Sequence, residues 1–136
     1  GVDMEETAMY TEYKQIIIML KSLKMGKGKL VSQGSHASVG SLIVDMEENE
    51  THFLIPKTPA NVAWLNGSFT KITVSVDTLE ELEAIYEEAK KRGLPAIKIT
   101  DNGRTTFNGV PTVTAVGIGP AHISDLDFTK HLKLLN

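Results

Sequence analysis

The sequence predicts a single three-layer α/β domain, in which a mixed central sheet of about four strands carries helices on both faces. Segments with the apolar pattern of strands alternate with segments that have the pattern of helices, and this order is typical of layered α/β proteins. Residues 13–20 contain a continuous apolar run, which favours a strand buried on both faces. A length of 136 residues fits one domain of ordinary size.

The first part of the chain is expected to supply a tail, a strand and a helix. Residues 1–12 are polar and acidic, and we expect a flexible tail there, followed by one domain over residues 13–136. The apolar run at residues 13–20 is short and a glycine-containing loop soon follows, which favours a strand over the alternative of a buried helix. Residues 29 to about 46 have apolar positions at roughly heptad spacing and many small residues, which predicts a helix packed closely on the sheet.

The second half of the chain alternates between strands and helices. The strongest helix signal covers residues 78–91, where Thr78 and Glu81 form a capping box. Strand patterns at residues 72–76 and 96–100 flank it, so the three segments form a strand–helix–strand unit. The next link is short, so the following strand is expected to pair antiparallel and to make the sheet mixed. The remaining predictions are a loop with a short helix at residues 49–67, a strand at 112–119 stopped by Pro120, a brief helix at 123–128 and an extended end.

The composition excludes several classes of function. The chain has no cysteine, which excludes disulfides, thiolate metal sites and a cysteine nucleophile. No apolar run approaches the length of a membrane span and no secretory signal is visible, so we expect a cytoplasmic protein without a membrane segment. The net charge is −3, but residues 13–44 hold five lysines and no acidic residue, which leaves −8 on the rest. A basic region on an acidic body favours recognition of a few phosphates over the coating of a long duplex.

The basic region centres on Lys24-Met25-Gly26-Lys27-Gly28-Lys29, just before the predicted helix. Glycines let a backbone come close to a ligand. The first turn of a helix offers N–H groups and the positive end of the helix dipole, and lysines meet phosphates as point charges. This stretch therefore predicts a site for an anionic ligand. It is not a nucleoside-triphosphate loop, because Leu23 stands where the first glycine belongs and Leu30 replaces the metal-binding Ser or Thr.

Three polar side chains are candidates on the helix that follows. Lys29, Gln33 and His36 lie at i, i+4 and i+7, and these spacings share one helical face. A cation, an amide and an imidazole would then point the same way near the start of the helix. The alternative is a polar stripe that only faces solvent. The four histidines of the chain show no metal-ligand spacing, so no metal site is expected.

A second candidate follows the strand at residues 96–100. Asp101 stands at the carboxyl end of that strand, which is where ligands gather in open α/β sheets. Its carboxylate either closes an Asx-type turn over its own loop or faces a cavity beside Lys29. In the second case Thr105 and Thr112 would supply hydroxyls that hold a water or a substrate oxygen.

Several short motifs occur in order along the chain. They are Lys24-Met25-Gly26-Lys27-Gly28-Lys29, Gln33, His36-Ala37, Asp101-x-Gly103-Arg104-Thr105, Val113-Thr114, Gly119-Pro120 and the closing His131-Leu132-Lys133-Leu134-Leu135. In this order they resemble the archaeal and eukaryotic (type 2) peptidyl-tRNA hydrolases. One such motif is modest evidence, whereas several in the right order are strong evidence.

The resemblance implies hydrolysis of the ester that joins a peptide to the 3′-terminal ribose of tRNA, which recycles tRNA after drop-off from ribosomes. It implies peptidyl-tRNA as the partner, and it suggests a homodimer. Apolar residues around Trp64 or the C-terminal leucines are candidates for the dimer surface. No cofactor is expected. The family's active-site roles fall on Lys29, Asp101, Thr105 and Thr112, and substrate-binding roles fall on Gln33 and His36.

Ester hydrolysis needs an oriented water and a stabilised oxyanion. Our hypothesis is that Asp101 orients or deprotonates the water with help from Thr105, while Lys29 or a backbone N–H near the helix start stabilises the oxyanion. A threonine nucleophile is an alternative and needs a nearby base. A non-catalytic module that binds RNA or an acidic protein through the lysine–glycine stretch is a second class of function. Three basic residues are expected to meet tRNA phosphates, namely Lys24, Lys27 and Arg104.

Overall fold

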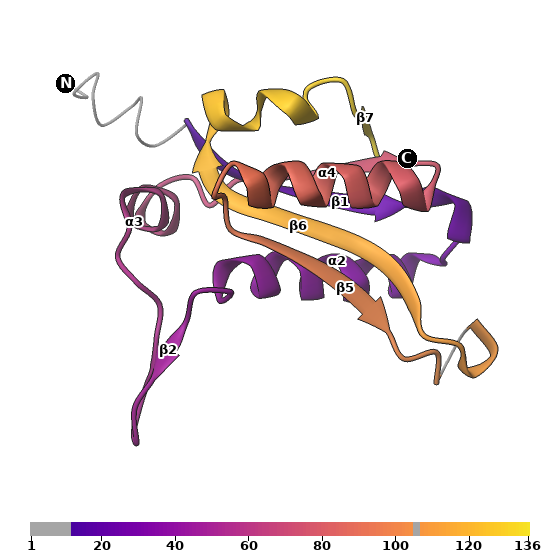
Figure 1. The fold of residues 1–136 in the computed structure, drawn as a ribbon, viewed down its shortest axis with the longest axis horizontal. Helices are drawn as coiled ribbons and strands as arrows, with labels where there is room; N and C mark the ends of the chain where they lie inside the picture. Colours follow the sequence, from indigo (N-terminus) through magenta and orange to yellow (C-terminus); the bar gives the residue numbers. More distant parts are fainter. Residues whose placement is uncertain (1–11, 105–106) are drawn as a thin grey trace.

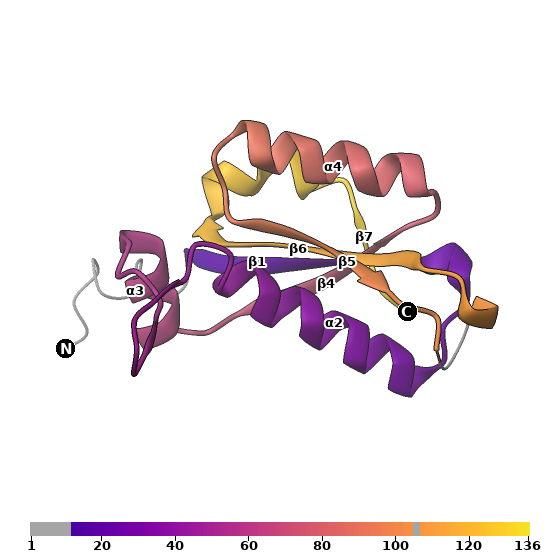
Figure 2. The same cartoon turned by 60° about the horizontal axis from the view of Figure 1, so that its bottom comes forward.

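The computed structural model describes residues 12–104 and 107–136, and it confirms a mixed sheet with helices on both faces (Figures 1 and 2). The sheet has five strands in the order β5-β6-β1-β4-β7. The fifth is a two-residue edge strand formed by the C-terminal segment that was expected to be extended. The strands are β1 (Tyr13–Leu20), β4 (Lys71–Val76), β5 (Ala96–Asp101), β6 (Thr112–His122) and β7 (Lys133–Leu134). Helix α2 (Lys27–Leu42) covers one face, and α4 (Leu79–Lys91) with the short helix η3 (Ile123–Thr129) covers the other (Figure 2).

The expected N-terminal tail lies outside the described residues except for Glu12. The carbonyl of Glu12 accepts a hydrogen bond from the N–H of Ile123 at 2.8 Å, so this residue is tied to the start of η3. In the described part of the chain, no helix combines the length and the apolar character that crossing a membrane requires.

Strand β1 lies at the centre of the sheet and confirms the strand predicted from the apolar run. It pairs parallel with β4 and antiparallel with β6. Its side chains alternate between the two layers: Ile16 and Ile18 join the large core under α4, while Ile17 and Met19 join the smaller core under α2. Burial on both faces explains why the run is apolar at every position instead of at every second one.

Helix α2 begins earlier and ends earlier than the sequence predicted. It starts at Lys27, with Gly26 as its N-cap, so Lys27 and Gly28 belong to the first helical turn and not to a loop. It ends at Leu42, four residues before the expected end. The acidic residues that follow, Asp45 among them, would meet the negative end of the helix dipole if the helix continued.

The many small residues of α2 allow the helix to lie directly on the sheet, as predicted. A Cβ on Gly117 of β6 would fall 2.2 Å from the backbone oxygen of Ala37. A Cβ on Gly40 of α2 would lie 3.1 Å from the side chain of Ile97 on the adjacent strand β5. Close backbone approach therefore sets the height of α2 above β5 and β6, and with it the position of the side chains at its N-terminus.

The strand–helix–strand unit is present, with α4 connecting β4 to β5. The hydroxyl of Thr78 accepts from the N–H of Glu81 at 3.2 Å, which confirms the capping signal. Strands β1 and β6 lie between β4 and β5 in the sheet. The pair β5–β6 is antiparallel, as expected.

The sequence predicted that strand β6 would stop at Pro120, and that prediction was wrong: β6 continues to His122. Its register against β1 shifts between Lys14 and Ile16, so that Gly119 and Pro120 together oppose Gln15. A proline is tolerated at such a bulge because the bulge does not require an N–H donor from it.

The segment between α2 and β4 contains a hairpin that the sequence reading missed. Strands β2 (Glu47–Glu48) and β3 (Phe53–Leu54) pair antiparallel and extend away from the sheet (Figure 1). The expected short helix is α3 (Pro59–Asn66). The hydroxyl of Thr58 caps it by accepting from the N–H of Asn61 at 3.1 Å.

Candidate active site

Lys29 and Asp101 meet at one end of the sheet. Lys29 lies in the first turn of α2, and Asp101 is the last residue of β5. The Nζ atom of Lys29 is 3.1 Å from Oδ2 of Asp101, and the two side chains are 17% and 13% exposed. The spatial convergence expected from the sequence is therefore present, and the pair is largely shielded from water while still reachable.

The carboxylate of Asp101 also closes its own turn. Its Oδ2 atom accepts from the backbone N–H of Gly103 at 3.2 Å. The Asx-type turn and the contact with Lys29 were weighed as alternatives, but the structure contains both. The turn fixes the carboxylate on one side, and the ammonium fixes it on the other.

Thr112 lies directly beside Asp101. The two residues face each other in the antiparallel register of β5 and β6, and directly opposed side chains lie on the same face of a sheet. The hydroxyl of Thr112 donates to the carbonyl of Val110 at 2.9 Å. Thr105, the other threonine expected here, lies outside the described residues.

Gln33 and His36 share a helical face with Lys29 but not its surroundings. Gln33 is 3% exposed, and its Oε1 atom accepts from the hydroxyl of Thr114 at 2.5 Å. His36 is exposed to solvent. The structure thus places Gln33 between α2 and β6, where it links helix and sheet, and leaves His36 on the outer flank of the helix.

The basic residues predicted to meet phosphates surround the start of α2. Lys24 and Lys27 are exposed, and Lys24 has a left-handed backbone with φ of 53°. Arg104 is exposed in the loop after β5, and its N–H donates to the Asn102 side chain. Figure 2 shows this loop beside the start of α2. The exposed cations therefore lie at the same end of the sheet as the Lys29–Asp101 pair.

Neither Gly26 nor Gly28 is required by the fold itself. A Cβ at either position would meet nothing within 4 Å among the described residues, and Gly26 has an ordinary φ of −68°. Both glycines therefore expose bare backbone on a surface where a larger side chain would also fit. This is the condition for close approach of a ligand to the backbone.

Comparison with protein families identifies the family of this chain. Residues 13–135 match the model of the family described as peptidyl-tRNA hydrolase PTH2. The chain belongs to this PTH2 family. The match covers nearly the whole chain, and the resemblance read from the sequence motifs is confirmed.

Curated relatives named as peptidyl-tRNA hydrolases occur in archaea and in an animal. A peptidyl-tRNA hydrolase of Methanothermobacter thermautotrophicus is 40% identical over 124 residues, covering 90% of this chain and 99% of its own. One from Methanocaldococcus jannaschii is 37% identical over 123 residues, with 90% and 99% covered. A probable peptidyl-tRNA hydrolase 2 of Drosophila melanogaster is 35% identical over 125 residues, covering 90% of this chain and 62% of its own.

The structure of this PTH2 member places one more residue beside Lys29, which the sequence reading did not single out. Phe107 lies in the loop between β5 and β6, and the Nζ atom of Lys29 is 5.7 Å from the centre of its ring. The signal available in the sequence was an aromatic residue within an otherwise polar, glycine-bearing loop. That signal does not specify which neighbour the ring meets.

A groove of about 540 Å³ runs along the other flank of α2. Strands β1 and β4 form its floor, and α2, Trp64 and Phe69 form its walls. The ammonium of Lys71 lies 3.2 Å from the centre of the Phe69 ring. Partial burial lowers the pKa of Lys71 below its usual value. Several apolar side chains at the groove are exposed, with Val31 at 70% and Val39 at 57%.

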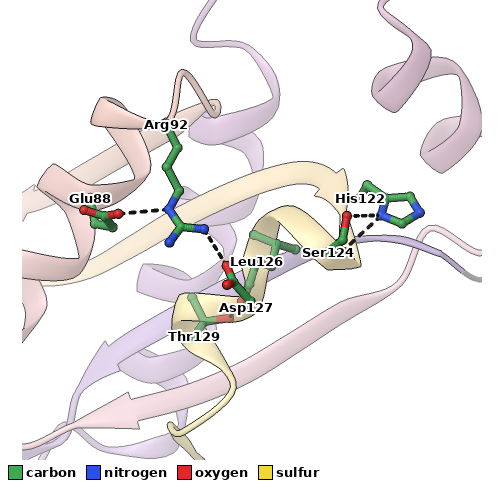
Figure 3. Close-up of polar contacts among 7 residues, drawn as sticks. All are labelled: Glu88, Arg92, His122, Ser124, Leu126, Asp127 and Thr129. Carbon is green, nitrogen blue, oxygen red and sulfur yellow. Dashed lines mark hydrogen bonds and ion pairs between the residues drawn. The ribbon is translucent and has the colours of Figure 1, made fainter.

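The polar contacts around the C-terminal end of β6 and the helix η3 stabilise the fold (Figure 3). The Nδ1 atom of His122 accepts from the N–H of Ser124 at 3.1 Å and caps η3. Arg92, at the end of α4, contacts Glu88 and Asp127. These contacts hold α4 and η3 together on the face of the sheet opposite α2.

Proposed function

We propose that this chain hydrolyses the ester between a peptide and the 3′-terminal ribose of tRNA, and that Lys29 and Asp101 carry the reaction. The observation that supports these residues is their approach to 3.1 Å in a partly buried corner at the carboxyl end of β5. Membership of the PTH2 family supports the substrate. Phosphate binding alone would not use the carboxylate, so this pair also favours an enzyme over a non-catalytic binding module.

In the proposed step, the carboxylate of Asp101 orients a water and accepts its proton as the water oxygen attacks the ester carbonyl. The carbonyl oxygen then carries a developing negative charge. The ammonium of Lys29 or a backbone N–H in the first turn of α2 stabilises that charge. The tetrahedral intermediate collapses, the bond from carbonyl carbon to ribose oxygen breaks, and the ribose oxygen takes the proton that Asp101 accepted from water, which restores the carboxylate. The products are a peptide with a free carboxyl group and tRNA.

The hydroxyl of Thr112 supports water as the nucleophile. A nucleophilic threonine needs a base that takes its proton. Asp101 lies beside Thr112 in the register of β5 and β6, but the hydroxyl of Thr112 donates to the carbonyl of Val110 and not to that carboxylate. We therefore assign Thr112 to holding the water or an ester oxygen beside Asp101, and we propose a similar role for Thr105.

Substrate binding is assigned to the basic residues around the start of α2. Lys24, Lys27 and Arg104 are exposed, and we propose that they meet phosphates of tRNA. The open surface at Gly26 and Gly28 allows the tRNA backbone to approach the helix N-terminus. Gln33 positions α2 on β6 through Thr114, while His36 on the outer flank remains a candidate contact for the substrate.

The test is deacylation of an N-acetyl-aminoacyl-tRNA. Lys29→Ala is expected to lower kcat by about 100- to 1,000-fold, as for removal of an oxyanion donor. Asp101→Asn is expected to lower it by about 100- to 10,000-fold, as for loss of a general base. Lys98→Ala is the matched control, because that lysine pairs with Glu83 on α4 at 3.6 Å, away from this corner. Full turnover by Lys29→Ala would reject the assignment, and tRNA binding without turnover by the unaltered chain would favour the binding module.

We further propose that the protein acts in the cytoplasm, where translation generates peptidyl-tRNA, and that it is a homodimer. The groove beside α2 is the proposed dimer surface. It lies next to Trp64 and Leu135, and exposed apolar surface of this kind is typical of interaction sites.

Sedimentation velocity tests the dimer. The unaltered chain is expected to sediment as a dimer, and Val31→Asp as a monomer because it places a charge in the groove. Leu79→Asp, at an apolar position of α4 that is 40% exposed, is the control and should remain dimeric. A monomeric unaltered chain would contradict the homodimer. A dimeric Val31→Asp would contradict this surface.

A further inference from the structure

Phe107 presents a large apolar ring that the core of the protein does not use. It is half-buried and belongs to neither of the two core clusters. Its ring lies beside the reacting corner, with its centre 5.7 Å from the Nζ atom of Lys29. Because the ring packs in neither core, packing of the core does not explain why an aromatic residue stands at this position.

The loop that carries Phe107 is closed by its own backbone. The N–H of Gly109 donates to the carbonyl of Gly103, and the N–H of Val110 donates to the carbonyl of Phe107, both at 2.9 Å. A Cβ on Gly103 would lie 2.6 Å from backbone atoms of Val110, so the two ends of the loop touch. Since Gly103 also binds the Asp101 carboxylate, the ring is held at a defined place relative to that carboxylate.

The backbone of the loop is strained at the ring itself. Phe107 has a φ of 61°, in the left-handed region that a bulky side chain rarely adopts, and Asn108, a residue that tolerates this region, follows with a φ of 51°. Strain of this kind persists only where the surrounding structure imposes it, and it clusters at functional sites. The closed loop therefore maintains an energetically unfavourable backbone conformation at Phe107, and this conformation sets the position of the ring.

We infer that Phe107 is the stacking platform for the adenine of the 3′-terminal adenosine of peptidyl-tRNA. This inference rests on the proposed function. The ester is carried by the terminal ribose, so the base attached to that same ribose must lie next to the reacting carbonyl. Unpaired terminal bases are bound by stacking on aromatic side chains. Stacking tolerates any sequence further along the strand, which suits an enzyme that serves many tRNAs.

The test compares two substrates and three variants. One substrate is an N-acetyl-aminoacyl-tRNA with its terminal adenosine, and the other is the same molecule with an abasic terminal ribose. On the complete substrate, Phe107→Leu is expected to raise KM about tenfold with little change in kcat, because it removes a stacking partner and keeps an apolar side chain. Phe107→Tyr restores KM because it keeps the ring. Val110→Ala is the control, since that side chain is 58% exposed on the same loop.

On the abasic substrate, Phe107→Leu and the unaltered chain are expected to have the same KM, because no base remains to stack. An unchanged KM for Phe107→Leu on the complete substrate would overturn the inference. So would an equal loss on both substrates, which would show that the ring only positions Lys29 or the loop. Failure of the unaltered chain to cleave either substrate would instead reject the proposed function, so the two failures are distinguishable.

Discussion

Lys29, Asp101 and Thr112 come from three different elements, and backbone constraints hold each of them in place. The Asx-type turn at Gly103 fixes the carboxylate of Asp101. The antiparallel register places Thr112 opposite it, and the close contact of α2 with the sheet at Gly117 sets the height of Lys29. Groups positioned in this way before the substrate binds need little reorganisation during the reaction, and this is the main source of electrostatic catalysis.

Thr112→Val distinguishes a water nucleophile from a threonine nucleophile. The substitution keeps the shape of the side chain and removes its hydroxyl. With water as the nucleophile, kcat for N-acetyl-aminoacyl-tRNA is expected to fall about tenfold, the value of one lost hydrogen bond. Loss of a true nucleophile typically costs about 10⁴-fold or more. A fall to background, or an acyl group found on Thr112 by mass spectrometry in a quenched reaction, would contradict the proposed mechanism.

Elements whose signals are local could be predicted from the sequence. The capping box at Thr78 marks the start of α4, and the apolar run marks β1. The hairpin of β2 and β3 was missed because strands of two residues carry no periodicity. The course of β6 through Pro120 was missed because it depends on a bulge opposite Gln15, a residue about a hundred positions away in the sequence.

In the candidate site, too, local signals could be predicted from the sequence, whereas contacts between distant segments could not. Motif order pointed to Lys29 and Asp101, and their meeting is present in the structure. Helical spacing placed Gln33 and His36 on one face, but spacing does not say which part of that face lies over a strand. Burial of Gln33 follows from β6 passing beneath it. Phe107 was missed for a related reason, because its contact with Lys29 depends on how the loop closes.

At the level of elements, Arg92 links α4 to η3, and this link should depend on pH. Hydrogen bonding from Arg92 is the main cause that holds the pKa of Asp127 below its usual value (Figure 3). A carboxyl with a lowered folded-state pKa stabilises the protein above its unfolded pKa, about 3.9, and this stabilisation is lost as the pH falls through the folded value. Asp127→Asn is therefore expected to lower the Tm at pH 7.

The measurement is thermal unfolding of both proteins between pH 7 and pH 2.5. The difference in Tm should be greatest at neutral pH and should shrink as the pH falls below about 4, since the carboxyl of the unaltered chain is then protonated first in the unfolded state and, at lower pH, in the folded state. Asp125→Asn is the control, as its side chain is exposed on the same short helix. A Tm difference that stays constant over this range would show that the charge of Asp127 does not act through Arg92.

At the scale of the whole molecule, the start of α2 and the helix α4 lie on opposite faces of the sheet and differ in charge within the described residues. The start of α2, with Lys24 and Lys27, lies on one side. Helix α4 on the other side carries five acidic residues, among them Glu80 and Glu81 in its first turn, and two lysines in its last turn. A chain with a net charge of −3 can therefore attract tRNA to one end while the acidic face repels it. We therefore expect this charge pattern to favour the approach of tRNA at the end of the sheet where Lys29 and Asp101 meet.

The same charge pattern predicts how the affinity for tRNA depends on salt. Each neutralised phosphate contributes about −0.7 to −0.9 to the slope of log K against log salt concentration. The double variant Lys24→Ala with Lys27→Ala is expected to weaken binding and to flatten that slope by about 1.5 in filter-binding or fluorescence titrations. Lys91→Ala removes an exposed lysine from the end of α4 and should leave the slope unchanged. Equal slopes for the double variant and the unaltered chain would place the phosphates elsewhere, and a flattened slope for Lys91→Ala would mean that tRNA also contacts the α4 face.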